Sequence, residues 1–295
     1  MINKDQVVTL VHSNSLAIDG LSKYFQNTLS VTINKVIKLS ECAYDLYLES
    51  ITPEQNQELR KKCYLEKIDI CIQPINAREK KILLSDMDAT IIENETLDDL
   101  VKLSGVETNV DETSKLAMEG KIDIETTLNT RLNHLKGKPK SLIDQALARI
   151  KFHPGSEVLV KTLNQKGFIT SLVTGGFAPI STFVGDRLGF QNVISNEFEF
   201  KDDYFTGEYV PITAGKNSKL NYLNKLTQEK SISKSKVVAI GDGANDLGML
   251  TNAGLGVGYH AHDIIKEQVA NQVFFNNLTT ILYYIGIPKK EFILI

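Results

Sequence analysis

Two aspartates separated by one residue follow a short apolar run, and their spacing could support covalent chemistry. The run is Ile82–Ser85, and Asp86 and Asp88 come directly after it. If the run is a strand, both carboxylates project near one point beyond its end, where one can attack a substrate while the other moves a proton. An aspartate nucleophile suits phosphoryl transfer, because water hydrolyses the resulting acyl-phosphate. A lone Asp-x-Asp is more often a solvated turn, so the interpretation depends on other segments.

Two later apolar runs end in residues that suit phosphate and metal binding. Phe168–Val173 precedes Thr174–Gly176, where a hydroxyl and backbone N–H groups could approach a phosphate closely. Val237–Ile240 precedes Gly241–Asp246, which reads Gly-Asp-Gly-Ala-Asn-Asp and offers the hard oxygen ligands that Mg²⁺ prefers. The terminal Glu of a twelve-residue calcium loop is absent. Because parallel strands end at one edge of an open sheet, we expect all three segments to converge there.

The elements that must position these residues alternate between short apolar runs and helical segments from residue 81 onward. This order predicts an α/β fold, a parallel Rossmann-like sheet covered by helices. Strands are expected at Ile82–Ser85, Phe168–Val173, Val237–Ile240, Leu255–Gly258 and Gln272–Phe275. Residues 95–150 show helical periodicity without a convincing strand, and we interpret them as a helical cap over one end of the sheet. Its helices are expected at Leu97–Leu103, Thr113–Met118, Ile124–Leu135 and Leu142–Ile150.

The first 75 residues have a different pattern, β-α-β-β-α-β, which is the order of a ferredoxin-like α+β unit. Its strands are expected at Val7–Val11, Val31–Leu39, Ala43–Leu48 and Ile68–Ile72, and its helices at Ser15–Gln26 and Pro53–Cys63. The polar segment Gln73–Lys80 contains Pro74 and is typical of a linker. The sequence therefore predicts two domains, 1–75 and 76–295, and the second contains the cap at about 95–150.

Composition narrows the class of protein further. The 295 residues include 33 basic and 36 acidic side chains, and this balance gives no electrostatic reason to bind nucleic acid. We find no run of about 18 apolar residues and no signal-peptide pattern at the start. The three cysteines, Cys42, Cys63 and Cys71, are odd in number and lack zinc spacing. We therefore expect a cytoplasmic protein with neither a membrane nor a nucleic acid as its partner.

In their order and residue types, the three strand-end motifs resemble those of the haloacid dehalogenase-like (HAD) phosphatases. The first motif is Asp86–Thr90, Asp-Met-Asp-Ala-Thr, and the others are Thr174–Gly176 and Gly241–Asp246. Further marks resemble the members of this family that act on O-phospho-L-serine; they are Glu95, Ala117–Gly120, Arg131 and Val173–Phe177. The resemblance covers roughly residues 82–260. It implies Mg²⁺-dependent hydrolysis of phosphoserine to L-serine and phosphate, the last step of serine biosynthesis, through an aspartyl-phosphate.

The resemblance also implies roles for the acidic residues. Asp86 would be the nucleophile, and Asp88 would protonate the leaving seryl oxygen and then deprotonate the attacking water. Mg²⁺ would be bound by the carboxylates of Asp86 and Asp242 and by the backbone carbonyl of Asp88. Asp246 would be a nearby carboxylate that orients the groups around the metal ion. A cation is needed on physical grounds too, because a dianionic phosphate is repelled by carboxylates.

The phosphate site implied by the family combines Thr174, the backbone of Gly175 and a lysine. Two lysines compete for that role, and spacing back from Gly241 favours Lys219 over Lys216. The usual alternative for either lysine is a solvated charge on a helix surface.

The amino-acid end of phosphoserine would be bound beside the cap. Glu95 would pair with the ammonium group and Arg131 with the carboxylate. Met118 would supply an apolar contact, and Asn245 would be a further substrate-binding residue. Two of these have structural alternatives, since Arg131 could be a helix-surface charge and Glu95 an acid favoured by a helix dipole.

Several alternatives stay open from sequence. The enzyme could be a HAD-family phosphatase or phosphotransferase for another small phosphate monoester. A non-catalytic binding protein is disfavoured, because every expected catalytic position is present. The ferredoxin-like unit could sense a ligand, form a homodimer, or only aid folding. His260 and His262 are interpreted as loop residues, since a third metal ligand is not evident.

Overall fold

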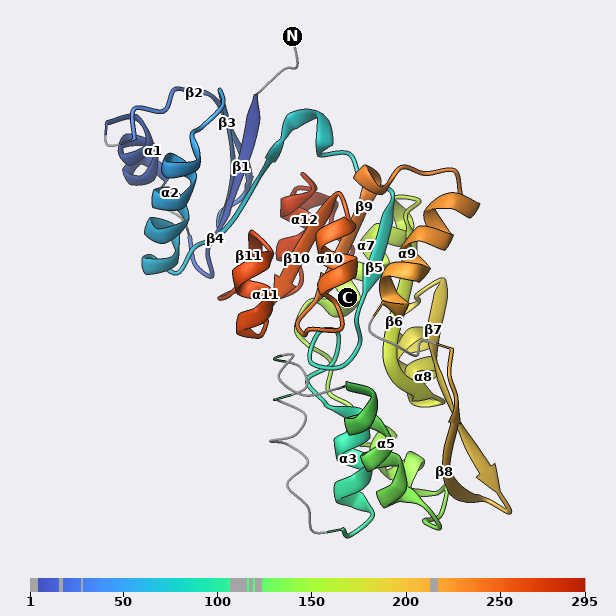
Figure 1. Ribbon diagram of the computed structural model, residues 1–295. Coiled ribbons are helices and arrows are strands. Elements are labelled where there is room, and N and C mark those ends of the chain that lie inside the picture. Colours follow the sequence, from blue (N-terminus) through green and yellow to red (C-terminus); the bar gives the residue numbers. More distant parts are fainter. Residues whose placement is uncertain are drawn as a thin grey trace.

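The chain folds around two sheets, which Figure 1 shows at the upper left and in the centre and right of the molecule. A computed structural model of the protein describes residues 5–15, 18–27, 29–106, 116, 119, 124–212 and 217–294. The first sheet has four strands and the second has seven. Within these ranges, no helix is both long and apolar enough to span a membrane.

The N-terminal unit is an antiparallel sheet covered on one face by two helices. Its strands are β1 (Gln6–Val11), β2 (Ile33–Ser40), β3 (Ala43–Leu48) and β4 (Asp69–Pro74), and its helices are α1 (Ile18–Asn27) and α2 (Pro53–Leu65). The sheet order is β2-β3-β1-β4, which confirms the predicted ferredoxin-like arrangement. Helix α2 begins at a capping box, in which the Thr52 hydroxyl accepts from the Gln55 backbone N–H at 3.2 Å and the Gln55 side chain accepts from the Thr52 N–H at 2.7 Å.

The second sheet has the order β11-β10-β9-β5-β6-β7-β8, and only β8 runs antiparallel to its neighbour. Its strands are β5 (Ile82–Ser85), β6 (Ile169–Ala178), β7 (Asn192–Lys201), β8 (Tyr204–Val210), β9 (Val237–Gly241), β10 (Leu255–Tyr259) and β11 (Asn271–Val273). Its helices are α7 (Ser156–Gln165), α8 (Ile180–Leu188), α9 (Ser218–Glu229), α10 (Leu247–Asn252), α11 (Asp263–Gln268) and α12 (Thr280–Tyr284).

Alternating residues of the central strands are buried against helices on both faces of the sheet. On β5, Leu83 belongs to the core that includes α7, α8 and α12, whereas Ile82 and Leu84 belong to the core that includes α9, α10 and α11. A strand buried on both faces must be apolar at every position, which explains why β5 and β9 are such clear signals in the sequence. The predicted parallel α/β fold is therefore confirmed.

Two details of the predicted sheet were wrong. The hairpin β7–β8 was not predicted: β7 mixes apolar with polar and charged residues, β8 contains a glycine, and both strands are partly exposed. Strand β6 runs on to Ala178, beyond the end predicted at Val173, so Thr174–Gly176 lies within the strand, at an irregularity between Val173 and Phe177 in the pairing with β7. Glycines within a strand allow other groups to approach its backbone closely.

The cap contains α3 (Thr96–Leu103), α5 (Ile124–Leu135) and α6 (Leu142–Leu147), and Figure 1 shows it below the seven-stranded sheet. It packs on the β7–β8 hairpin through a shared apolar core that includes Leu100, Leu132, Phe177, Phe198 and Phe205. The rings of Phe177 and Phe198 stack at 4.1 Å. Most of the helix expected at Thr113–Met118 lies outside the described residues.

The N-terminal sheet packs on the C-terminal part of the second unit. Asp69, at the start of β4, accepts hydrogen bonds from the backbone N–H groups of Phe274, Phe275 and Asn276 and from the Asn276 side chain. The two units are therefore joined by specific polar contacts as well as by the chain itself.

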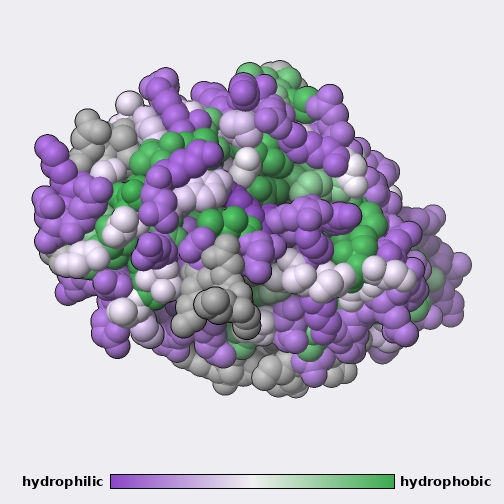
Figure 2. Space-filling model, turned by 90° about the horizontal axis from the view of Figure 1, so that it is seen from above, coloured by the Kyte–Doolittle hydropathy of each residue, from purple (hydrophilic) through white to green (hydrophobic). Residues whose placement is uncertain are grey.

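Figure 2 shows the molecule from the end opposite the cap, where hydrophilic and hydrophobic residues alternate over the surface.

Candidate active site

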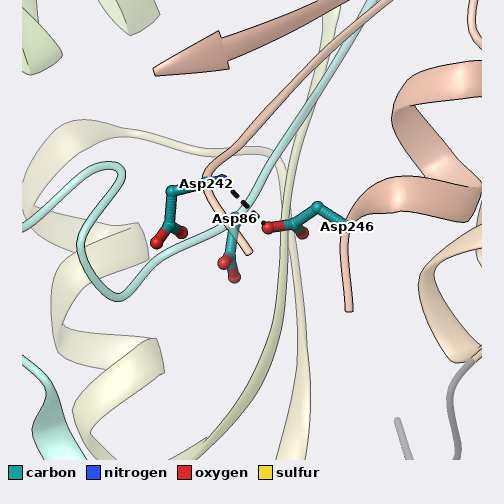
Figure 3. Close-up of side chains that lie close together, drawn as sticks. All are labelled: Asp86, Asp242 and Asp246. Carbon is teal, nitrogen blue, oxygen red and sulfur yellow. Dashed lines mark hydrogen bonds between the residues drawn. The ribbon is translucent and has the colours of Figure 1, made fainter. Parts of the chain in front are cut away.

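The carboxyl ends of β5 and β9 bring acidic residues together. These strands pair in parallel, with Ser85 opposite Ile240, so Asp86 and Asp242 emerge side by side. The carboxylates of Asp86, Asp242 and Asp246 offer oxygen atoms that all lie within 4.8 Å of one another, as Figure 3 shows. All three residues are buried. The predicted convergence of these two motifs is thus present in the fold.

Asp246, at the start of α10, holds this cluster together through its hydrogen bonds and its contact with Lys219. One of its oxygens accepts from the backbone N–H groups of Asp242 at 3.1 Å and Gly243 at 3.2 Å. The other oxygen lies 2.6 Å from the ammonium of Lys219. A Cβ atom on Gly241 would lie 2.3 Å from the Asp246 carboxyl carbon, so a glycine is required at the end of β9. Both oxygens of Asp246 therefore have protein partners.

Lys219 is buried on α9 and contacts two acids. Its ammonium lies 2.6 Å from the carboxylate oxygens of both Asp86 and Asp246. Burial alone would lower the pKa of Lys219, but these two carboxylates raise it above its ordinary value. Lys219 is therefore a permanent cation next to the proposed nucleophile, while Lys216 lies outside the described residues.

Asp88 is oriented by the first turn of the cap. Its carboxylate accepts from the backbone N–H of Thr96 at 2.8 Å, at the N-terminus of α3. Burial raises the pKa of Asp88 to about 6, although this hydrogen bond acts in the opposite direction. The next residue but one, Thr90, donates its hydroxyl to Asp242 at 3.2 Å. Sequence reasoning gave no role to Thr90 or Thr96, because their hydrogen-bond partners, Asp242 for Thr90 and Asp88 for Thr96, are brought to them by the fold.

The cluster has more negative than positive charge. Burial raises the pKa of Asp86 well above its ordinary range, and Asp246 adds to this effect while Lys219 opposes it. Burial and Asp246 likewise raise the pKa of Asp242 to about 7. Such shifts mean that ionising every carboxylate at once is unfavourable without a further cation. Closely spaced carboxylate oxygens are also the donor set that fits Mg²⁺.

Thr174 and the glycines after it lie on β6, next to these acids. The Thr174 hydroxyl accepts from the Gly176 backbone N–H at 2.9 Å, and Thr174 is buried. A Cβ atom on Gly176 would lie 3.0 Å from a carboxylate oxygen of Asp88, so this glycine lets β6 approach Asp88 closely. Gly175 is exposed, and its carbonyl accepts from the Asn196 side chain at 2.9 Å. The third motif therefore reaches the same edge of the sheet.

Glu95 lies close to the acids of the cluster, and Arg131 reaches the same region through its contact with Asp98. Burial raises the pKa of Glu95 well above its ordinary range, and the nearby Asp88 and Asp242 add to the effect. Arg131 is buried, and its Nε atom donates to Asp98 at 2.5 Å. Asp98 in turn raises the pKa of both Asp88 and Glu95. Sequence reasoning missed Asp98, although Glu95 and Asp98 are spaced to lie on one side of a helix.

Two remaining site predictions concern Met118 and Asn245. Met118 lies outside the described residues. Asn245, in the loop before α10, has a buried side-chain oxygen without a hydrogen-bond partner in the part of the chain that the structure describes. A buried acceptor left open beside a cluster of acids is suited to a ligand that brings its own N–H or O–H donor.

Comparison with known proteins agrees with this site. A family model of haloacid dehalogenase-like hydrolases matches residues 83–251. The chain therefore belongs to the haloacid dehalogenase-like hydrolases. Within them it is similar to phosphoserine phosphatases, and it is an enzyme of the phosphoric monoester hydrolase class.

Relatives from several organisms support that assignment. The phosphoserine phosphatase of Methanocaldococcus jannaschii is 34% identical over 208 residues, 70% of this chain and 99% of that protein. The phosphoserine phosphatase of Archaeoglobus fulgidus is 31% identical over 239 residues, 80% of this chain and 70% of that protein. A third, from Streptomyces coelicolor, is 32% identical over 217 residues, and the match spans about half (53%) of its length.

Solved structures cover both units of the fold. A HAD family hydrolase from Salmonella enterica serovar Typhi is 27% identical with a TM-score of 0.84, and the match covers 96% of this chain and 99% of that one. A phosphoserine phosphatase solved as a phospho-aspartyl intermediate analogue is 34% identical with a TM-score of 0.67, covering 70% of this chain and 99% of that one.

Proposed function

We propose that this enzyme hydrolyses O-phospho-L-serine to L-serine and phosphate. The observation that supports this most is the position of Glu95 among the acids of a buried cluster that includes one lysine, with Arg131 bound to the neighbouring Asp98. The acid cluster suits phosphoryl transfer, and the two cap residues suit a zwitterionic amino acid. The named relatives act on the same substrate.

Asp86 and Asp88 would carry out the two proton-coupled steps. A carboxylate oxygen of Asp86 would form a bond to phosphorus while the bond between phosphorus and the seryl oxygen breaks. Asp88, protonated at this stage, would donate its carboxyl proton to the departing seryl oxygen. Asp88 would then take a proton from water, whose oxygen bonds to phosphorus while the bond to Asp86 breaks. A pKa of about 6 at Asp88 suits both directions of this transfer near neutral pH.

The phosphate oxygens would be held by a lysine, a hydroxyl and a backbone group. The ammonium of Lys219 already contacts the carboxylate of Asp86, so it can reach an oxygen of a phosphoryl group on that residue. Thr174 and the N–H of Gly175 would approach from β6. These fixed donors would stabilise the charge on the transferring group.

The donor set also fits Mg²⁺, which Asp86, Asp242 and the backbone carbonyl of Asp88 would bind. Asp246 would orient this site, since both of its oxygens already accept from the protein. The bound ion would supply positive charge against the phosphate and the carboxylates. The raised pKa values of Asp86 and Asp242 support this, because a divalent cation would favour their ionised forms.

The amino-acid end of the substrate would lie between the sheet and the cap. The ammonium group would pair with Glu95, whose pKa is raised among other acids and would fall beside a cation. Arg131 would bind the carboxylate, with Asp98 holding its guanidinium in place. Met118 and the open acceptor of Asn245 would complete the pocket.

A second candidate is a HAD phosphatase or phosphotransferase for another small phosphate monoester. The acid cluster suits that reaction equally well. A substrate without an amino-acid end, however, would leave Glu95 without a cation to pair with. The cap residues therefore favour phosphoserine.

Several wider assignments stay predictions. The division into 1–75 and 76–295, with the cap at about 95–150, is supported by the two separate sheets. A homodimer through the N-terminal unit, a cytoplasmic location and a place in the last step of serine biosynthesis follow from the sequence patterns and the resemblance.

A phosphate-release screen tests the proposal. Purified enzyme would be assayed on phosphoserine, phosphothreonine and common sugar phosphates, with Mg²⁺ and with a chelator. We expect phosphoserine to be among the best substrates and the chelator to abolish release. Fast release from sugar phosphates and slow release from phosphoserine would support the second candidate.

A further inference from the structure

The cap is joined to the seven-stranded sheet by two connections, and these pair with each other. One connection leads from β5 to α3, and the other leads from α6 to α7. An antiparallel bridge joins Ile92 of the first to Phe152 of the second. The backbone N–H of Glu93 donates to the carbonyl of Lys151 at 2.8 Å. The base of the cap is therefore a short pair of extended segments.

The side chain of Asn94 adds two further hydrogen bonds to this pair. Its Oδ1 atom accepts from the backbone N–H of Lys151 at 2.8 Å. Its Nδ2 atom donates to the backbone carbonyl of Arg149 at 3.3 Å. Asparagine suits this position because one amide group offers both an acceptor and donors. Asn94 thus ties the connection that contains it to the other one.

The same amide also reaches the first turn of α3. Its Nδ2 atom donates to a carboxylate oxygen of Asp99 at 2.7 Å. Asn94 comes one residue before the N-cap, Glu95, and Asp99 is the fourth residue of the helix. Apolar pairs at these two positions fix the angle at which a chain enters a helix, and here a polar pair is placed to do so. In the described first turn, the Glu95 side chain itself makes no capping hydrogen bond.

The backbone around Asn94 contacts the catalytic motif. The carbonyl of Asn94 accepts from the N–H of Ala89 at 3.1 Å, and the φ of Ala89 is 51°, in the left-handed region. A residue with a Cβ atom holds this conformation only when its surroundings determine it. Two residues after Asn94, the N–H of Thr96 donates to Asp88 at 2.8 Å. Residues 94–96 therefore contact both Asp88 and the residue that follows it.

We propose that Asn94 is a positioning residue for the cap side of the active site. By tying both cap connections to the start of α3, its amide sets the position of Glu95 and of the Thr96 N–H that orients Asp88. Both atoms of the amide bond to protein groups, so Asn94 acts on the substrate through these neighbours. The inference rests on the proposed function, because it concerns the groups proposed to bind and protonate phosphoserine.

Removing the amide without adding charge tests this role. Asn94→Ala should lower kcat/KM for phosphoserine about 30-fold, because Glu95 and Asp88 are both displaced. For p-nitrophenyl phosphate, which has no ammonium group to pair with Glu95, the loss should be about threefold. Steady-state assays on the two substrates give a ratio that a general loss of folded enzyme would not change.

Asn164→Ala is the matched control. The Asn164 amide also joins separate segments, since its Nδ2 donates to the carbonyl of Gly189 at 2.6 Å and its Oδ1 accepts from the Thr170 hydroxyl at 2.8 Å. These contacts lie near the start of β6, at the edge of the sheet opposite the acids. The control should keep the parent ratio between the two substrates. Thermal unfolding of both variants shows how much stability each loses.

Exchanging the amide and the carboxylate gives a rescue. Asn94→Asp alone sets a second carboxylate against Asp99 and should lose as much activity on phosphoserine as Asn94→Ala. Adding Asp99→Asn restores a donor opposite an acceptor, so this double variant should recover kcat/KM to within about fivefold of the parent enzyme. Asp99→Asn alone keeps an acceptor oxygen for Asn94 and should stay within about threefold.

Three results would overturn the inference. The first is a loss in Asn94→Ala of the same size on both substrates, and the second is an unchanged kcat/KM for phosphoserine in that variant. The third is a double variant no more active than Asn94→Asp. If the parent enzyme itself releases no phosphate from phosphoserine, the proposed function fails instead. Recovery of p-nitrophenyl phosphate turnover in the double variant would then still report on the position of Asp88.

Discussion

Two regions of the molecule bury carboxylates, and they differ in the groups that surround the carboxylate. At the junction between the two sheets, Asp69 accepts from three backbone N–H groups and one amide at 2.7 to 3.2 Å. At the catalytic edge, Asp242 has the Thr90 hydroxyl at 3.2 Å and two acidic neighbours, Asp86 and Asp246. Asp69 has only donors around it, whereas Asp242 has two acids beside it, with the Thr90 hydroxyl and, at 3.8 Å, Nε2 of His262 as its other neighbours.

The difference separates structure from function. Burial raises the pKa of Asp69, and its N–H donors oppose that shift. Burial also raises the pKa of Asp242, but there Asp246 adds to the shift instead of opposing it. All four donors to Asp69 at the junction belong to the protein itself. The catalytic edge is complete only with a cation, which suits a site that binds Mg²⁺ and phosphate.

The largest expected effect comes from removing the nucleophile. Asp86→Asn keeps the shape of the side chain but cannot form the acyl-phosphate, so phosphate release should fall on the order of 10⁴-fold. Steady-state assays on phosphoserine and p-nitrophenyl phosphate measure this. Asp69→Asn, made at the other buried carboxylate, is the control and should keep turnover within about twofold. Substantial turnover in Asp86→Asn would contradict the assigned nucleophile.

The next effect should be selective for the substrate. Arg131→Ala is expected to lower kcat/KM for phosphoserine about 100-fold, because a charged partner of its carboxylate is lost. For p-nitrophenyl phosphate, which has no amino-acid end, the loss should be about threefold at most. Arg131→Lys keeps a cation beside Asp98 and controls for damage to the cap. Equal losses on the two substrates would reject an amino-acid pocket at Arg131.

A substitution at the junction between the two sheets should lower the stability of the protein and leave its catalytic activity unchanged. Asp69→Asn sets an amide N–H₂ against donors that need an acceptor, so we expect about 2 kcal/mol less stability. Denaturant unfolding measures this against Asp263→Asn, since Asp263 lies on the exposed side of α11. A stability loss no greater than in the control would show that the contacts of Asp69 contribute little.

The smallest effect is the pH dependence of the metal-free enzyme. The pKa values of Asp88, about 6, and Asp242, about 7, lie above 3.8, so the folded protein binds these protons more tightly than the unfolded chain. Their contribution to stability is therefore full below about pH 4 and is lost as the pH rises through 6 to 7. Mg²⁺ should raise the unfolding temperature by about 3 °C more at pH 8 than at pH 5.

Asp242→Asn removes one of these acids and should reduce that pH-dependent response to Mg²⁺. Calorimetry or dye-based unfolding at both pH values measures it. An equal response to Mg²⁺ at pH 5 and pH 8 would show that proton and cation do not compete at this site.

Much of the fold could be predicted because its strongest signals are local. Strands β5 and β9 are buried on both faces, so they are apolar up to their last residues, Ser85 and Gly241, and the acids after them stand out. The β7–β8 hairpin could not be recognised in the same way, since its strands are only partly buried and mix apolar with polar and charged residues. Its pairing, including Phe198 with Tyr209, depends on contacts across the sheet.

The amino-acid sequence by itself determined which chemistry the molecule carries. The Asp-x-Asp pair, the Gly-Asp-Gly-Ala-Asn-Asp run and the strands before them are continuous in the chain, so residue type and spacing identify them. Only the tertiary structure decided which cation meets which acid, namely Lys219 between Asp86 and Asp246, and Arg131 on Asp98. Those pairs join residues far apart in sequence, and their energies depend on burial, which a linear pattern does not specify.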